Sequence, residues 1–330
     1  MKDILVIKLG ALGDMVLAEG ALRDIRAHHA GDRITLLTTL PYRSLMERCP
    51  WADRVWIDPR APRWRFDRLW RLRRAFHDGR FDMVYDLQNS PRTELYFRHL
   101  FPEVAWSGTA AGCSHPHPRD QAAYGLGRLS DQLRAAGVRV RFAEHPSLAW
   151  MVDDAEATLR RTGVAGPFAV LITGSSARNH DKRWPHFEQL ALALRQRDCI
   201  PVTVPGPDEL RSPEFPATLR IVKKNGHWLD LFELAGVLAR AHLVVGNDSG
   251  PTHMAALLGV PGVVLSREPG SYASQVLAQA GMVVLEGPDL GRISVDAVLA
   301  AIDRLDLRRP VPRAPSAPRP ALPEASIAPT

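Results

Sequence analysis

Three stretches of the chain carry acidic, basic or hydroxyl side chains directly after a short apolar run. The first is Gly10-x-x-Gly13-Asp14, which follows the run at 4–7 and opens a helix-like segment. A glycine-bearing turn between a strand and a helix normally holds a phosphate on the free N–H groups of the helix. A carboxylate at Asp14 would repel a phosphate, although the helix dipole favours it there. Asp14 is therefore either a helix N-cap or a general base, and the local residues allow both roles.

The second stretch combines hydroxyl groups with a cation. Ser175 and Ser176 follow the apolar run at 168–174, and Lys182 comes shortly before a helix-like pattern. A single lysine is by default an ordinary surface residue. Its place between a strand end and a helix start also allows a phosphate-binding role.

The third stretch runs from a strand-like pattern at 242–247 into Asp248, Ser249 and Gly250. The helix that follows has Pro in its first turn and Gly just past its end, the usual asymmetry of helix ends. Gly250 lets a ligand approach the backbone, and the free N–H groups of the first turn suit an anion. His253 can point to the same place. The alternatives are that Ser249 only caps the helix and that His253 only packs locally.

Strand-like and helix-like patterns alternate around these stretches through both halves of the chain. The predicted strands are residues 4–7, 34–39, 55–58, 82–87, 168–174, 200–206, 219–224, 242–247, 262–266 and 282–287, and the predicted helices are 15–28, 41–48, 64–77, 153–163, 184–197, 229–240, 251–258 and 294–306. Such alternation is typical of a parallel sheet with helices on both faces. Two successive series predict an α/β protein with two Rossmann-like domains facing each other across a cleft, a usual place for a ligand. We assign 1–155 to the first domain, 156–309 to the second, and a disordered Pro/Ala-rich tail to 310–330.

The composition excludes several classes of protein. The 330 residues are 45% hydrophobic, but no apolar run approaches the roughly 20 residues of a membrane span. We expect no signal peptide, because Met1 leads almost directly into a strand-like run. Three scattered cysteines without a Cys-x-x-Cys pair predict a reduced, cytoplasmic protein. The formal net charge of +6 suggests an acidic partner such as nucleic acid, a membrane surface or a phosphorylated substrate.

Much of the positive charge lies at 60–80, where arginines surround Trp64, Phe66, Trp70 and Phe76. One interpretation is a helix that packs its aromatic residues on the sheet and leaves the arginines solvated. The other is a basic surface for anionic lipid headgroups or a phosphorylated acceptor. No nucleic-acid-binding module accompanies the charge, so nucleic acid is disfavoured as a partner.

Two further chemistries are disfavoured by spacing. A dinucleotide site needs a third glycine in the first turn and an acid at the end of the second strand, and both are missing here. The cluster Cys113, His115 and His117 is too closely spaced for a usual structural zinc site, so we expect this loop to hold no metal.

Taken together, the motifs resemble glycosyltransferase family 9, the heptosyltransferases of lipopolysaccharide core assembly. The matching motifs are Gly-Asp in the first turn, Lys-Arg-Trp-Pro after a Gly-Ser-Ser loop, and Gly-Asn-Asp-Ser-Gly-Pro-x-His-x-Ala-Ala-x-x-Gly-x-Pro, and the similarity covers residues 1 to about 308. It implies a GT-B fold with the acceptor on the N-terminal domain and a nucleotide sugar, usually ADP-heptose, on the C-terminal domain. It also implies inverting transfer without a metal or cofactor, and an acceptor in the inner leaflet that a cytoplasmic enzyme would meet at the membrane surface.

The resemblance also implies roles for single residues. Asp14 matches the catalytic base, with Gly13 beside it on the acceptor side, and Lys182 matches the lysine that binds and stabilises the departing diphosphate. The other matches are Ser175 and Ser176 at the diphosphate loop, Asp248 as the acid that contacts the sugar, Ser249 and Gly250 at the diphosphate with His253 beside them, Glu209 as a ribose-binding acid, and Leu229 in the adenine pocket.

One loop departs from the family pattern. Where the family commonly shows Phe-Gly-Pro-Thr after a strand, residues 266–270 are Ser-Arg-Glu-Pro-Gly. This loop borders the implied donor site, so the departure leaves the nucleotide and the sugar open. The alternatives are therefore a family member that uses another nucleotide sugar and a non-catalytic protein that only binds one. The missing third glycine disfavours a nicotinamide-dependent oxidoreductase.

Overall fold

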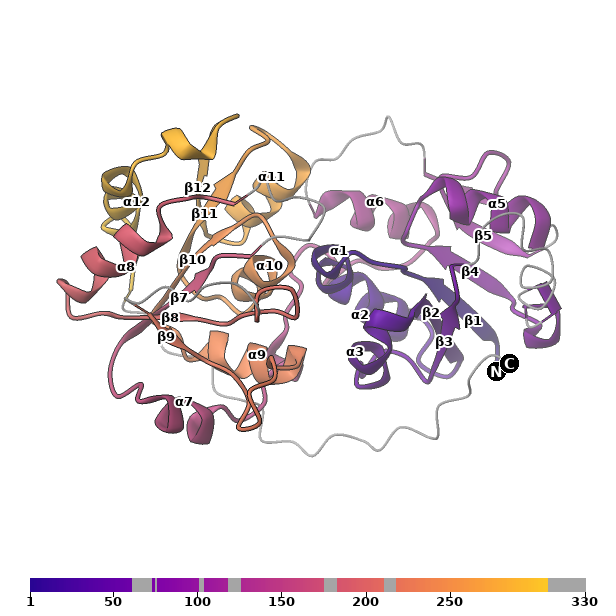
Figure 1. Ribbon diagram of the computed structural model, residues 1–330. Coiled ribbons are helices and arrows are strands. Elements are labelled where there is room, and N and C mark those ends of the chain that lie inside the picture. The colour runs from indigo at the N-terminus through magenta and orange to yellow at the C-terminus, as the bar shows by residue number, and fades with distance from the viewer. Residues whose placement is uncertain are drawn as a thin grey trace. The chain divides into compact units, whose positions relative to one another are not determined.

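Two six-stranded parallel sheets with helices around them form the framework of the computed structural model, which describes residues 1–60, 73–74, 76–100, 104–117, 126–174, 183–210 and 218–307 (Figure 1). Contacts within the chain divide it into two compact units, with the boundary in the sequence between Pro146 and Ser147. Each unit holds one of the sheets. No helix in the part of the chain that the structure describes has both the length and the apolar character needed to cross a membrane.

The first unit has the strand order β3-β2-β1-β4-β5-β6. Its strands are β1 (Asp3–Ile7), β2 (Arg33–Thr39), β3 (Arg54–Asp58), β4 (Met83–Asp86), β5 (Ala105–Gly108) and β6 (His115–Pro116). Its helices are α1 (Leu12–Leu17), α2 (Glu19–His28), the 3-10 turn η1 (Leu40–Tyr42), α3 (Arg43–Glu47), α5 (Pro91–Leu100) and α6 (Gly127–Ala135).

The second unit repeats this order with its own strands, as β12-β11-β10-β7-β8-β9. The strands are β7 (Phe168–Ile172), β8 (Ile200–Thr203), β9 (Leu219–Arg220), β10 (Leu243–Asn247), β11 (Gly262–Ser266) and β12 (Val283–Glu286). The helical elements are η2 (Ala149–Met151), α7 (Glu156–Thr162), α8 (Phe187–Arg195), α9 (Leu231–Ala239), α10 (Gly250–Leu257), α11 (Tyr272–Gln279), η4 (Leu290–Arg292) and α12 (Val295–Ile302).

The central strands of both sheets are covered on both faces, which explains their unbroken apolar runs. Every side chain from Ile4 to Ile7 of β1 is fully buried, as are Val244 and Val245 of β10. Helix α8 packs on the second sheet with a single apolar stripe. In α8 the buried positions Phe187, Leu190, Ala191 and Leu194 follow the three-and-four spacing of a helix face.

In both sheets the first three strands of the unit are added towards one edge and the next three towards the opposite edge, so the strand order has a switch point. In the first unit this point lies between β1 and β4, and in the second between β7 and β10. In open sheets of this kind, ligands bind outside the carboxyl ends of the strands at such a switch point. The loops that matter most are therefore those following these four strands.

The predicted strands are all present, with ends that differ by a few residues. The sequence patterns missed β5 and β6, which are short and carry few branched apolar residues. The predicted helix 15–28 is two helices, α1 and α2, which meet at Ala18. Most of the predicted helix 64–77, and all of the tail 310–330, lie outside the described residues.

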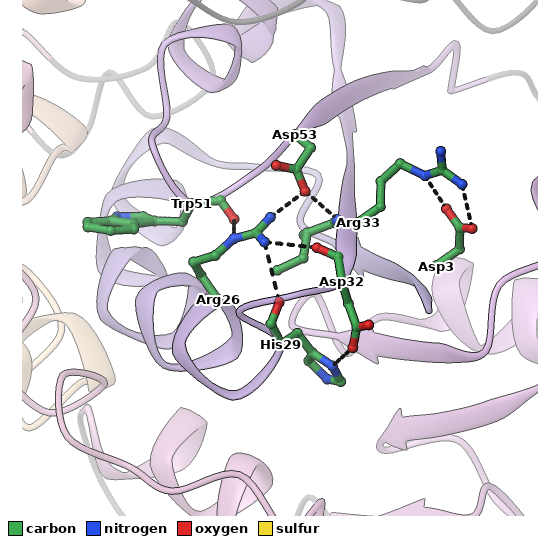
Figure 2. A network of polar contacts seen from close by, with 8 residues as sticks. Asp3, Arg26, His29, Asp32, Arg33, Trp51 and Asp53 are labelled. Carbon is green, nitrogen blue, oxygen red and sulfur yellow. Dashed lines mark hydrogen bonds and ion pairs between the residues drawn. The ribbon is translucent and has the colours of Figure 1, made fainter. Parts of the chain in front are cut away.

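A network of polar contacts ties together the amino ends of the first three strands (Figure 2). Its members are Asp3, Arg26, His29, Asp32, Arg33, Trp51 and Asp53. Arg26 of α2 donates to backbone carbonyls and pairs with Asp53, which precedes β3. Arg33 at the start of β2 donates two hydrogen bonds, of 2.5 and 2.7 Å, to Asp3 at the start of β1. Because these contacts lie at the edge opposite the strands' carboxyl ends, they stabilise the sheet and contribute no groups to its switch point.

Candidate functional site

Asp14 lies in the first turn of α1, the helix that follows β1, at the switch point of the first sheet. It is the third residue of α1, and its exposed carboxylate accepts a hydrogen bond of 3.3 Å from the N–H of Ala11. The N-cap prediction for Asp14 is wrong, because the extended backbone of Ala11 makes that residue the N-cap. The carboxylate therefore satisfies a free N–H group of the first turn and remains open to solvent, as a general base requires. Gly13 precedes it within the same turn of helix.

The backbone between β1 and α1 is held by side chains from the end of β2 and from the loops after β3 and β4. The N–H of Leu9 donates to Oε1 of Gln88 at 2.8 Å. The carbonyl of Leu9 accepts hydrogen bonds of 3.0 Å from Oγ1 of Thr39 and from Nη2 of Arg60. Both polar groups of this peptide segment are thus satisfied by side chains, at the place where β1 has left the strand ladder.

A buried lysine connects this turn to the loop after β4. The side chain of Lys8 is only 7% exposed, and its Nζ donates to the carbonyl of Leu87 at 3.0 Å. Burial lowers the pKa of Lys8, while the nearby carboxylates of Asp14 and Asp86 favour its charged form. Burial in turn raises the pKa of Asp86 to about 6, against the hydrogen bonds that it accepts from backbone N–H groups of its own loop. The ammonium group of Lys8 therefore interacts with two carboxylates, those of Asp14 and Asp86.

At the switch point of the second sheet, Asp248 and Ser249 join β10 to α10, and Gly250 is the first residue of α10. Ser249 is the N-cap of α10, and its hydroxyl lies 3.1 Å from that of Thr252. His253 is buried, and its Nε2 lies 3.2 Å from Oδ1 of Asp248. Nδ1 of His253 has no hydrogen-bond partner among the described residues. The imidazole of His253 thus holds the carboxylate of Asp248 through Nε2, while its Nδ1 makes no hydrogen bond to the described residues.

Asn247 holds both flanks of the segment that contains the predicted diphosphate loop. Its Nδ2 donates to the carbonyl of Thr173 at 3.0 Å, and its Oδ1 accepts the N–H of Trp184 at 3.0 Å. Asn247 is fully buried at the end of β10. The described chain on either side of 175–182 is therefore attached to the residue that precedes Asp248.

Glu209 lies in the loop after β8 and reaches the end of β7. Its two carboxylate oxygens accept hydrogen bonds from Oγ1 of Thr173 at 3.1 Å and from the N–H of Gly206 at 3.0 Å. A Cβ added at Gly174 would come within 2.4 Å of this carboxylate, so a larger residue there would displace the carboxylate from its present position. Glu209 thus stands one strand away from the second switch point.

Leu229 lies in the loop between β9 and α9, just before the N-cap Asp230. Its side chain is buried, whereas the neighbouring Trp228 is 41% exposed. Since β8 and β9 are adjacent in the sheet, the loops that hold Glu209 and Leu229 follow neighbouring strands. The loop 266–270, where the chain departs from the family pattern, follows β11 on the other side of β10.

Ser175, Ser176 and Lys182 lie outside the described residues. Sequence reasoning assigned no role to Thr39, Gln88 or Asn247, because nothing in their local patterns signals a contact with a distant loop. Within the described ranges, no group of three or more His, Cys, Asp or Glu side chains could hold a metal ion.

Comparisons with known proteins give a consistent result. The model of the family described as glycosyltransferase family 9 (heptosyltransferase) matches residues 69–268. A family 9 glycosyltransferase from Veillonella parvula has 21% identity and a TM-score of 0.73, with 92% of this chain and 96% of that chain covered. Escherichia coli ADP-heptose LPS heptosyltransferase II has 21% identity and a TM-score of 0.68, with 92% and 98% covered.

Escherichia coli heptosyltransferase WaaC, solved with ADP, has 20% identity and a TM-score of 0.66, with 91% of this chain and 97% of that chain covered. No curated protein matches the chain. At these identities the likeness shows the fold, and it confirms the predicted α/β GT-B class.

Proposed function

This chain belongs to glycosyltransferase family 9 and is a glycosyltransferase, and from that premise we propose that it moves a heptose from ADP-heptose to a lipopolysaccharide core acceptor. The proposed transfer inverts the anomeric centre and needs neither a metal nor a cofactor besides the sugar donor. The main support is the placement of Asp14 and Asp248 at the switch points of the two sheets. The similar Escherichia coli WaaC has been solved with ADP and with ADP-2-deoxy-2-fluoro heptose, which supports the choice of donor.

In the proposed reaction Asp14 takes the proton from the acceptor hydroxyl as that oxygen attacks the anomeric carbon. The bond between the anomeric carbon and the diphosphate oxygen breaks, and the electron pair leaves with the nucleoside diphosphate. General-base assistance of this kind contributes roughly 10²–10⁴-fold to the rate. The exposed carboxylate of Asp14 suits this step because it reaches solvent without losing its contact to Ala11.

The second sheet would bind the donor along its carboxyl edge. The N–H groups at the start of α10, with Ser249 and Gly250, would hold the diphosphate, together with Ser175, Ser176 and Lys182. Asp248, fixed by His253, would contact the sugar. Glu209 would bind the ribose and Leu229 the base, in the order of the neighbouring strands β8 and β9. Fixed donors of this kind stabilise the charge that develops on the leaving diphosphate.

Donor selectivity tests the proposal directly. The protein is titrated with ADP, UDP, GDP and CDP by calorimetry in the presence of EDTA, and turnover of ADP-heptose is then measured with core acceptors. Tight and selective binding of ADP is expected, with turnover that EDTA leaves unchanged. A preference for UDP would keep the reaction class but move the sugar donor. Binding of ADP without any turnover would favour the non-catalytic alternative.

Replacing Lys182 with alanine is expected to weaken ADP binding about 10- to 100-fold, the loss typical of one hydrogen bond to a charged group. Calorimetry of the variant checks this value. Lys2, an exposed lysine before the first strand, provides the matched control, and Lys2→Ala is expected to bind ADP like the wild type. Unchanged affinity in Lys182→Ala would remove this lysine from the diphosphate site.

The cellular setting is also part of the proposal. We place the enzyme in the cytoplasm, in peripheral contact with the inner face of the membrane that holds its acceptor. The arginine-rich segment 60–80, most of which lies outside the described residues, supplies the positive charge for anionic headgroups. Sedimentation with anionic and with neutral vesicles tests this contact, and equal sedimentation with both would contradict it.

A further inference from the structure

We propose that Thr39 and Gln88 are positioning residues for the transfer reaction, because their side chains fix the peptide groups of Leu9 and thereby the turn that carries Asp14. The inference rests on the proposed role of Asp14 as the base. The resemblance to the family assigned no role to either residue. Three features of the turn support this role: the hydrogen bonds that anchor it, its packing against Tyr42, and its place in the first unit, whereas the proposed donor-binding residues belong to the second.

The anchoring of Leu9 comes from both sides of β1. Thr39 is the last residue of β2, the neighbour of β1 on one side, and Gln88 follows β4, its neighbour on the other. Thr39 donates to the carbonyl of Leu9 at 3.0 Å, and Gln88 accepts its N–H at 2.8 Å. Arg60, beyond the end of β3, donates a second hydrogen bond of 3.0 Å to the same carbonyl. Beyond the end of β1, side-chain hydrogen bonds to Leu9 thus replace the backbone hydrogen bonds of the sheet.

The residues between this anchor and Asp14 have little freedom of their own. Gly10 has φ +115°, and a Cβ added there would lie 2.4 Å from the ring of Tyr42. The turn is therefore packed directly against that ring. The N–H of Ala11 donates to the carboxylate of Asp14 itself. A displacement of Leu9 would consequently be transmitted to Asp14, because the intervening backbone is packed on one side and bonded to Asp14 at the other end.

Such positioning matters because general-base catalysis needs the carboxylate within hydrogen-bond distance of the acceptor hydroxyl. A misplacement of about 1 Å, even one caused by a substitution remote from the reacting atoms, can lower the rate by about 100-fold. Functional groups keep their geometry only when surrounding hydrogen bonds and packing hold them. The proposed donor-binding residues belong to the second sheet, so a loosened turn after β1 should affect turnover and spare donor binding.

The test uses isosteric changes that remove single hydrogen bonds. Thr39→Val removes the hydroxyl donor and keeps the shape, and Gln88→Met removes the acceptor. Because Arg60 still holds the carbonyl of Leu9 in Thr39→Val, we expect about a 10-fold loss of kcat in each single variant and about 100-fold in the double variant. The dissociation constant of ADP should stay within about twofold of the wild type, since no donor contact changes.

Two controls separate positioning from general damage. Thr39→Ser keeps the hydroxyl and should restore kcat to near the wild-type value. Thr35→Val changes a threonine that is equally buried, lies in the same strand and, four residues away, points to the same face of the sheet, and it should leave kcat unchanged. Equal losses of kcat and ADP affinity in Thr39→Val, or no rescue by Thr39→Ser, would overturn the proposal.

Asp14→Ala, measured in parallel, distinguishes the two hypotheses. Full activity of Asp14→Ala would refute the role of Asp14 as the base, and the positioning argument would fall with it. Loss of activity in Asp14→Ala together with wild-type kcat in the Thr39→Val, Gln88→Met double variant would refute the positioning argument alone. Loss in both, with donor affinity retained, supports both.

Discussion

Replacing Asp14 with alanine is expected to lower kcat at least about 100-fold while the affinity for ADP changes little. The carboxylate lies after β1 in the first unit, whereas the residues proposed to bind the donor belong to the second sheet. A base acts only as the acceptor hydroxyl loses its proton, so its removal affects the transition state and not the bound donor. Steady-state kinetics with ADP-heptose, together with calorimetry of ADP, measures the two effects separately.

Asp14→Asn is the matched control for the contact that Asp14 makes within its own turn. The amide oxygen of asparagine can still accept the N–H of Ala11, but the side chain cannot take a proton at neutral pH. We therefore expect Asp14→Asn to be as inactive as Asp14→Ala. Activity that returns in Asp14→Asn would show that the turn needs only an acceptor, and equal loss of binding and turnover would show that Asp14 is structural.

The second large effect is expected in stability. Asp58, at the end of β3, is fully buried and accepts hydrogen bonds of 3.0 and 2.8 Å from Arg92. Its carboxylate also accepts the hydroxyl of Tyr96 at 2.6 Å and the N–H of Arg60 at 2.7 Å. Burial and the neighbouring carboxylate raise the pKa of Tyr96, so its phenol stays protonated and donates. One carboxylate thus satisfies donors from the loop after β3 and from α5.

Asp58→Ala is expected to lower the free energy of unfolding by about 3–5 kcal/mol, because it leaves the charge of Arg92, which is largely shielded from solvent, without its carboxylate. Urea denaturation followed by circular dichroism measures this change. Asp131→Ala removes a carboxylate that pairs with Arg134 while both side chains are about half exposed, and it should cost at most about 1 kcal/mol. Similar small losses in both variants would mean that Arg92 and Tyr96 find other partners.

Most strands could be predicted from the sequence because helices cover both faces of the two sheets. Strands buried on both faces, such as β1 and β10, have unbroken apolar runs that are visible in any sequence. The short strands β5 and β6 carry Ser107, Gly108 and Pro116, and their pattern resembles that of a loop. The boundary between the two units depends on tertiary contacts, which divide the chain after Pro146, whereas the order of the predicted elements placed it after residue 155.

The candidate site was predictable only in its local parts. Asp14 and the run from Asp248 to Gly250 each lie where a strand is followed by the first turn of a helix, an order that the sequence displays directly. Sequence alone did not distinguish a cap from a base at Asp14, because both roles favour a carboxylate near a helix start. In the structure the helix begins at Leu12 with Ala11 as its N-cap, and the carboxylate of Asp14 is exposed.

What the amino-acid sequence determined by itself was the alternation of elements, the α/β class and the motifs of family 9. All of these are local, because side-chain periodicity and turn chemistry act over a few residues. Only the tertiary structure decided which polar groups meet. Gln88 reaches Leu9 across 79 residues of chain and Thr39 across 30. Such contacts depend on which strands become neighbours in the sheet, and no local pattern encodes that choice.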